Sequence, residues 1–270
     1  MPGPIAAFVG LAVILTVFSM VWILSLRLRD ASIADVCWGL GFVLLVWVYC
    51  VLSPASTPRS WLVAVLITVW GTRLSLHIFL RRYGKGEDPR YQSMRDSNGR
   101  AFWWRSLFTV FWLQGAILWF VALPLLVAVR ATEPAAVTAI DGVGVLLFAI
   151  GFGFEVVGDY QLHQFKAKPS NRGQVLDRGL WRYTRHPNYF GDATLWWGVF
   201  LLAAATPGGW LTVLSPSLMT ILLRRVSGVT LLEAGLKSSK PGYGDYMTRT
   251  PAFLPRFPRA ARSAVGGTRD

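Results

Sequence analysis

The stretch GLWRYTRHPNYFGD, residues 179–192, is followed at once by the apolar run ATLWWGVFLLAAA, residues 193–205. It combines arginine side chains, which bind phosphate and carboxylate groups, with several aromatic rings. The apolar run that follows is hydrophobic enough to enter a membrane. This combination is unusual for a connecting loop, so the stretch is the first candidate for a functional site beside a membrane helix.

The composition is that of a membrane protein. Of the 270 residues 53% are hydrophobic and 15% charged, and the mean hydropathy is +0.44, which is too apolar for an ordinary soluble domain. The net charge of +13 lies in short blocks between apolar runs, which favours membrane topology and anionic lipids over nucleic-acid binding. Cys37 and Cys50 lie in apolar stretches without metal-ligand spacing, so no metal site is expected.

The apolar segments predict an all-α integral membrane protein, a bundle of seven transmembrane helices. About 20 residues cross the hydrocarbon core, and the expected spans are residues 4–26, 34–53, 60–80, 106–129, 137–160, 189–206 and 208–223. The last two are short and joined by the turn TPGG, which indicates a hairpin that is partly buried or re-entrant. The first lacks a positive region before it and a cleavage site after it, so we expect a retained helix.

Basic residues alternate between the expected loops. The first, third and fifth loops and the tail carry most of them, whereas the second has only Arg59, the fourth only Arg130 and the sixth none. Because Lys and Arg favour the cytoplasmic side, we expect the N-terminus outside and the C-terminus in the cytoplasm, in a bacterial inner membrane. The third loop, the fifth loop and the tail would form a cytoplasmic cap. We expect one domain over residues 1–258 and a disordered tail over 259–270.

Acidic residues within apolar segments are costly and usually face a partner or a cavity. Asp35 starts the second span, where it is either an interfacial partner of Arg27 or Arg29, a helix N-terminal acid, or a functional group. Glu155 and Asp159 are spaced i, i+4 and therefore share one helical face. A ribose diol, an ammonium group or an arginine beside them would relieve their repulsion.

The fifth span also contains glycines in a pattern that superficially resembles a dinucleotide fingerprint. That fingerprint needs a strand, a turn and a helix N-terminus, and this context is missing. Close helix packing explains small residues in a membrane helix instead. The glycines concerned are Gly142, Gly144, Gly151, Gly153 and Gly158.

Three polar stretches of the chain are further candidates for functional or structural roles. The loop RRYGKGEDPRY, residues 81–91, reads either as a solvated loop or as a site toward which Arg73 and His77 point from one helical face. In residues 179–192, Pro187 predicts a helix start whose free N–H groups attract phosphate, although basic residues and aromatics are also expected at any cytoplasmic membrane boundary. The tail stretch PGYGDY, residues 241–246, indicates a folded cap until about Pro258.

Together these stretches resemble a known family. GLWRYTRHPNYFGD, GDYQLHQFK, WGTRL, GEDPRY, LLE and PGYGDYMTRTPAFLP are similar to segments of the bacterial DUF1295 proteins, which belong with the steroid 5-alpha-reductase-like membrane enzymes. The resemblance covers most of residues 30–258. The isoprenylcysteine carboxyl methyltransferases, a related superfamily that uses S-adenosylmethionine, carry a similar Arg-His-Pro-x-Tyr segment.

The resemblance implies a seven-helix bundle that binds NADPH in a cytoplasmic cavity and reduces an activated C=C bond of a lipid or steroid-like enone. In the matching motifs Asn188, Asp192 and Asp159 would contact the cofactor, and Lys166 and Arg225 stand where the family has basic residues. Glu155 stands where steroid reductases tend to have Asn. The full set of expected cofactor-binding residues is Asp159, Lys166, Arg182, Arg185, His186, Asn188, Tyr189, Asp192, Arg225 and Tyr246.

The family polarises its substrate with a Gln-Glu pair and a Tyr, and this chain has no clean copy of that pair. Asp35, Glu87 and Tyr91 are the nearest catalytic candidates, with Tyr91 favoured because a phenol can donate to a carbonyl without losing a charge. Two other readings stay open. A membrane methyltransferase usually has paired glutamates where this tail has Leu232-Glu233, and a transporter or lipid-binding module would carry an acid–base line through the bundle.

Overall fold

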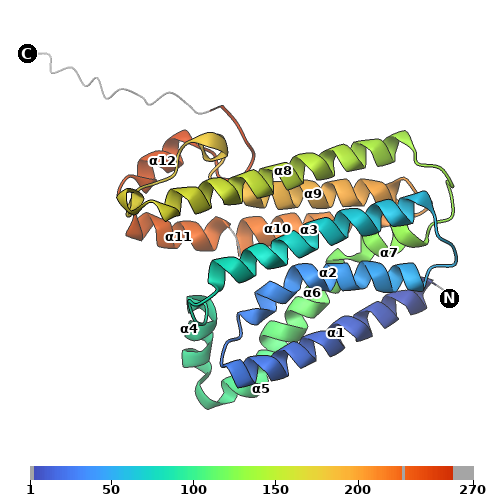
Figure 1. Cartoon of the computed structure of the whole chain (residues 1–270), viewed down its shortest axis with the longest axis horizontal. Coiled ribbons are helices and arrows are strands. Elements are labelled where there is room, and N and C mark those ends of the chain that lie inside the picture. The colour runs from blue at the N-terminus through green and yellow to red at the C-terminus, as the bar shows by residue number, and fades with distance from the viewer. Residues whose placement is uncertain (1–2, 227–228, 258–270) are drawn as a thin grey trace, which may run out of the picture. The chain divides into compact units, whose positions relative to one another are not determined.

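A computed structural model describes residues 3–226 and 229–257, and within them every regular element is helical and no strand is present (Figure 1). The all-α prediction is therefore confirmed. Helices suit apolar surroundings because they satisfy their own backbone hydrogen bonds. Five helical segments are long and apolar enough to cross a membrane, which gives the chain the character of a membrane protein. They are α1 Gly3–Leu28, α2 Ile33–Val51, α3 Pro58–Arg82, the helical run Pro89–Arg130 and α8 Ala139–Ala167.

These five segments overlap the first five expected spans, although the fourth, Pro89–Arg130, begins well before the expected span 106–129. The last two expected spans are also helical, as α9 Pro187–Ala204 and as a run made of η5 Gly209–Val213, α10 Leu214–Ile221 and the π-helix η6 Leu222–Val226. Neither belongs to the five candidate spans. The helical segments are therefore established, whereas a total of seven membrane crossings stays a prediction.

The chain divides into two compact units, each of which is described by itself. Among the described residues, unit 1 comprises residues 3–145 and 199–216, and unit 2 comprises residues 146–198, 217–226 and 229–257. The helices α8 and α9 each run from one unit into the other along the chain. The expected single domain over residues 1–258 stays a prediction, and the expected disordered tail, residues 259–270, lies outside the described residues.

Unit 1 is built around α2, which packs against α1 and α3. Its buried core includes Phe18, Phe42, Trp70 and Phe111. Between α3 and α8 the chain forms α4 Pro89–Asn98, η1 Gly99–Ala101, α5 Phe102–Ser106, the π-helix η2 Leu107–Trp112, α6 Leu113–Val121 and α7 Leu123–Arg130. Local signals fix the start of α3, because Thr57 forms a capping box with Ser60.

Unit 2 contains α8 from residue 146, η3 Pro169–Asn171, η4 Gly179–Arg182, α9 up to residue 198, α11 Val229–Ser239 and α12 Tyr243–Arg249. Pro187 is the first residue of α9, a position where its missing N–H costs nothing. The tail is folded to residue 257 and pairs with the stretch before α9, since Arg185 N donates to Pro251 O at 2.9 Å and Arg256 N donates to Tyr183 O at 2.9 Å.

Candidate functional site

The first cluster of candidate residues lies in unit 1 and centres on Tyr91, whose side chain is 6% exposed. The Tyr91 hydroxyl donates to Asp35 Oδ1 at 2.7 Å, and Gln114 Nε2 donates to the Tyr91 oxygen at 2.8 Å. Arg90 Nη2 binds the other oxygen of Asp35 at 2.8 Å. We call Asp35, Arg90, Tyr91 and Gln114 the tyrosine cluster.

Asp35 lies in the first turn of α2, so the interpretation as a helix N-terminal acid is confirmed. Its ion-pair partner among the described residues is Arg90, and neither of the expected partners, Arg27 and Arg29, forms that pair. The reason is the short helix α4, which carries Arg90 and Tyr91 to Asp35 together. Three-dimensional proximity thus overrides proximity in sequence.

The start of α4 is held against the turn between α1 and α2. Asp88 caps α4 by accepting from Arg90 N at 3.0 Å, and its own N–H donates to Ser32 Oγ at 3.0 Å. Glu87 accepts from Ala31 N at 2.8 Å and from Arg95 at 2.8 Å. Burial opposes the ionised form, but the hydrogen bonds from Arg95 and Ala31 lower the pKa of Glu87 below its ordinary value. The contacts of Glu87 anchor the loop that positions Tyr91.

The tyrosine cluster can present a phenol to a substrate carbonyl only if the hydroxyl exchanges Asp35 for the substrate. Gln114 would then continue to donate to the phenol oxygen and stabilise negative charge there. Sequence reasoning missed Gln114. The signal was present, since Gln114 is an isolated carboxamide within the apolar segment 106–129, and polar groups in such segments usually have a specific partner.

The second group lies in unit 2, where α8 meets the start of α9. Glu155 and Asp159 are 3% and 7% exposed, and Asn188 Nδ2 donates to Asp159 Oδ1 at 3.1 Å. A hydrogen-bonding carboxamide therefore lies beside Asp159, and the expectation of a group that relieves the repulsion between the two acids stays a prediction. We call Asp159 and Asn188 the Asp–Asn pair.

Aromatic and acidic side chains surround the start of α9. The rings of His186 and Tyr189 are stacked with centroids 5.4 Å apart and planes 5° from parallel. Asn188 Oδ1 accepts from Tyr189 N at 3.1 Å, which holds the first turn of the helix. Asp192 follows one turn later on α9, and Lys166 lies exposed in the last turn of α8.

Arg185 is engaged within the protein. Its Nε and Nη2 atoms bind the two oxygens of Glu233 at 2.7 and 3.0 Å, and its Nη1 donates to Met247 O at 3.1 Å and to Thr250 O. His186 Nε2 also lies 3.1 Å from Glu233. We call Arg185, His186 and Glu233 the arginine cluster. The expected grip of Arg185 on a phosphate would require it to give up these bonds.

Glu233 carries the negative charge of the arginine cluster. Burial opposes ionisation, but hydrogen bonds from His186 and Arg185 lower the pKa of Glu233 from 4.5 to about 2, so the carboxylate is ionised at neutral pH. The sequence offered one signal for this contact, an acid in a basic tail downstream of an Arg-His pair. Because α11 and α12 both supply partners, the cluster ties the tail to the RHPNY segment.

The remaining expected cofactor-binding residues comprise one buried side chain and two exposed ones. Tyr246 is 2% exposed and donates to Trp181 O, and burial raises its pKa, so it packs within the protein. Arg182 and Arg225 are exposed. Beside Arg225, the guanidinium of Arg224 lies 5.5 Å from the ring centroid of Phe253. The described residues contain no group of three His, Cys, Asp or Glu side chains that could hold a metal ion.

Residues 21–250 match a family described as "Protein of unknown function (DUF1295)". This chain belongs to the DUF1295 family. The match confirms the resemblance to the DUF1295 proteins and spans both clusters and the Asp–Asn pair, whereas the relationship to steroid 5-alpha-reductase-like enzymes stays a prediction. The chain is also similar to "Uncharacterized protein C594.04c" of Schizosaccharomyces pombe, with 26% identity over 283 residues that cover 92% of this chain and 79% of the relative. No solved structure matches. The DUF1295 description names no activity, so function rests on the chemistry of the residues.

Proposed function

We propose that this DUF1295 protein is an NADPH-dependent membrane reductase that reduces an activated C=C bond of a lipid or steroid-like enone. In this proposal the seven helical segments cross a bacterial inner membrane, with the N-terminus outside. The tail, the third loop and the fifth loop then form a cap on the cytoplasmic side, where NADPH is available. The proposal joins the resemblance to steroid 5-alpha-reductase-like enzymes to one structural observation.

That observation is the Asp–Asn pair. The two residues are 29 positions apart in the chain, yet their side chains meet at 3.1 Å. Both stand in motifs through which the resemblance implies cofactor contact. A buried carboxylate beside a carboxamide offers acceptors and donors to a ribose or an amide, and buried polar groups of this kind commonly mark binding sites.

The surrounding residues fit a dinucleotide. Carboxylate and carboxamide oxygens suit sugar hydroxyls, the start of α9 offers N–H groups to a phosphate, and the exposed cations Lys166, Arg182 and Arg225 suit the several negative charges of NADPH. When bound, the reduced nicotinamide would supply the hydride that adds to the β carbon of the enone. Arg185 and His186 would act by holding the fold of this segment through Glu233.

The tyrosine cluster would serve the substrate. The Tyr91 hydroxyl would turn from Asp35 to the carbonyl oxygen and stabilise the negative charge that develops there as the β carbon is reduced. Gln114 would position the phenol, and Arg90 would hold Asp35 after its hydrogen bond to Tyr91 is released. Protonation of the α carbon by water then completes the saturated ketone.

Cofactor binding is tested on purified protein by thermal shift with NADPH, and by mass spectrometry of nucleotides that co-purify after gentle extraction. We expect NADPH to stabilise the wild type. Asn188→Ala should weaken NADPH binding about 10-fold or more, because the cofactor loses both the donor and the acceptor of the Asn188 carboxamide. Asn98→Ala, which removes a carboxamide in unit 1, is the matched control. Absence of NADPH stabilisation in the wild type would overturn the proposal.

A second function is favoured by one contact, that between Glu233 and His186 at 3.1 Å. The methyltransferase reading needs an acid from the tail beside the Arg-His-Pro-x-Tyr segment, and Glu233 is such an acid. Its charge is already matched by Arg185, which leaves less attraction for the sulfonium of S-adenosylmethionine. Stabilisation by S-adenosylmethionine in preference to NADPH would make this the leading function.

A further inference from the structure

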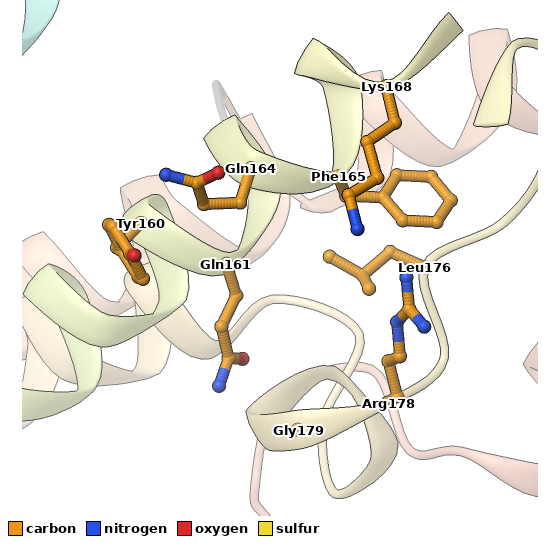
Figure 2. A pocket seen from close by; sticks show the side chains of 8 residues that line it. All are labelled: Tyr160, Gln161, Gln164, Phe165, Lys168, Leu176, Arg178 and Gly179. Carbon is orange, nitrogen blue, oxygen red and sulfur yellow. The ribbon is translucent and has the colours of Figure 1, made fainter. Parts of the chain in front are cut away.

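Unit 2 contains a pocket of ≈ 280 Å³ that the proposed reduction does not use. It lies between the end of α8 and the loop that leads to η4. Phe165, Leu176 and Arg178 lie together on one side of it, with Tyr160 and Gln161 on the other (Figure 2). Its apolar floor belongs to a small core made of Phe165, Leu176 and Trp181.

The pocket occupies a different face of α8 from the Asp–Asn pair. Gly151 and Asp159 are eight residues apart and both contact α9, through Gly191 and Asn188. Residues one and two positions after Asp159 are rotated by about 100° and 200° around the helix, so Tyr160 and Gln161 point elsewhere. The pocket is therefore a separate site.

The length of α8 places the pocket at the level of lipid headgroups. The helix has 29 residues and measures about 44 Å at 1.5 Å per residue, whereas the hydrocarbon core is about 30 Å thick. A span that begins at the start of α8 therefore leaves its last turns, residues 160–167, beyond the hydrocarbon. Tyr160 is 62% exposed, as expected of a tyrosine in the interfacial belt.

Two cations line the same pocket. Lys168 and Arg178 are exposed, and neither forms an ion pair with any residue in the described part of the chain. The guanidinium of Arg178 lies 5.8 Å from the ring centroid of Phe165, so a positive charge and an apolar wall meet at one point. Leu180 N donates to Gln161 Oε1 at 3.0 Å, which holds the Gln161 side chain at the edge of the pocket.

We propose that this pocket binds the headgroup of an anionic phospholipid, with the phosphate between Lys168 and Arg178 and the first hydrocarbon carbons against Phe165 and Leu176. The pocket, at ≈ 280 Å³, lies just below the range of about 300–1,000 Å³ typical of ligand sites, which suits a headgroup better than a whole dinucleotide. Basic pockets at the ends of membrane helices bind such lipids by the same chemistry. This proposal does not depend on the reductase proposal.

Native mass spectrometry of the delipidated full-length protein tests the site, with phosphatidylglycerol as the anionic probe and phosphatidylcholine as the zwitterionic one. We expect phosphatidylglycerol to bind more tightly. In Lys168→Gln/Arg178→Gln its affinity should fall about 30-fold, since each cation near the membrane surface contributes about fivefold. The control Arg100→Gln/Arg172→Gln removes two exposed cations that lie outside the pocket and should change the affinity less than about threefold.

Equal losses in both double variants would show general surface attraction and overturn the site, as would equal affinity of the wild type for the two lipids. Glycerol phosphate in large excess separates a lipid from a soluble phosphate compound. Retention of phosphatidylglycerol supports the lipid, whereas its displacement would assign the pocket to a free organic phosphate and overturn the lipid proposal. Thermal shift of each variant without lipid checks that the fold is kept.

Discussion

Arg59 and Asp141 form a bidentate ion pair that is sealed from solvent. The Nε–Oδ1 and Nη2–Oδ2 distances are both 2.8 Å, and the two side chains are 1% and 0% exposed. The pair joins the first turns of α3 and α8. Thr138 N donates to Asp141 at 2.7 Å, and Arg59 donates to Pro134 O at 2.9 Å, so both buried charges are also hydrogen-bonded, as a stable buried pair requires.

Arg59→Ala should therefore destabilise the protein strongly, because it leaves the carboxylate of Asp141 buried without its charged partner. Breaking a buried pair costs about 3–5 kcal/mol, and we expect a large fall in melting temperature in detergent. Arg100→Ala, which removes an exposed arginine of unit 1, should change stability by less than about 0.5 kcal/mol. A similar small effect of both variants would contradict the role of the pair.

This ion pair shows what the sequence could and could not reveal about the fold. Hydrophobic length alone located the helical segments, because that signal is local. Arg59 was counted as a free loop charge, yet it is buried against a residue 82 positions away. Charge counting reports composition, whereas the partner depends on how α3 and α8 pack.

The contact between Arg185 and Glu233 predicts a pH-dependent stability. The pKa of Glu233 is lower in the folded protein, about 2, than its ordinary value of 4.5. A depressed carboxyl pKa stabilises the fold fully above the ordinary value, and this contribution is lost as pH falls from about 4.5 to about 2. Its full size is on the order of 3 kcal/mol.

We therefore expect the melting temperature of the wild type to fall more steeply between pH 5 and 3 than that of Glu233→Gln, which has no carboxyl group to titrate. The control Asp96→Asn removes an exposed carboxylate and should keep the wild-type slope. Parallel curves for the wild type and Glu233→Gln would show that the contact does not contribute in solution.

The hydroxyl of Tyr91 is the centre of a second testable network, since it donates to Asp35 and accepts from Gln114. Tyr91→Phe removes both hydrogen bonds and should lower the free energy of unfolding by about 1–3 kcal/mol, because the Gln114 amide is left without its acceptor. A double-mutant cycle with Gln114→Leu should give a coupling of about 0.5–1.5 kcal/mol. Tyr160→Phe, at an exposed tyrosine, is the matched control.

Additivity of Tyr91→Phe and Gln114→Leu would mean that the two side chains do not interact in solution. The same variants bear on function, because Tyr91→Phe should leave NADPH stabilisation unchanged under the proposed division of roles. A loss of NADPH stabilisation in Tyr91→Phe, measured against the melting temperature of the same variant without NADPH, would contradict that division.

The polar contacts of the candidate site were predictable in part, at the positions that sequence motifs identified. Residue types in the RHPNY segment indicated polar contacts there, and Asn188 does meet Asp159. The motif could not reveal that Arg185 is committed to Glu233, because that contact depends on how the tail folds back over 48 residues. The role of Gln114 was not predictable for a related reason, because its partner Tyr91 is distant in sequence. A single carboxamide in an apolar segment does not identify its partner, and the contact forms because α4 places Tyr91 beside Gln114.

The contact between α8 and α9 gives the sharpest test of packing within unit 2. A Cβ atom at Gly151 would lie 2.4 Å from Gly191 O and 2.5 Å from Leu195 N, so the two helix backbones touch there. A Cβ atom at Gly153, two residues further along α8, would meet nothing within 4 Å. Gly151→Ala should therefore destabilise the protein by about 1–3 kcal/mol or more, because α9 must move away.

Gly153→Ala is the matched control and should be neutral or stabilising by up to about 1 kcal/mol, since alanine favours helix over glycine. Melting temperatures of the two variants in one detergent make the comparison. Because α9 carries Asn188, Gly151→Ala should also weaken NADPH stabilisation, whereas Gly153→Ala should preserve it. Equal behaviour of the two variants would show that α8 and α9 do not approach at Gly151, and would remove the support that this contact gives to the Asp–Asn pair.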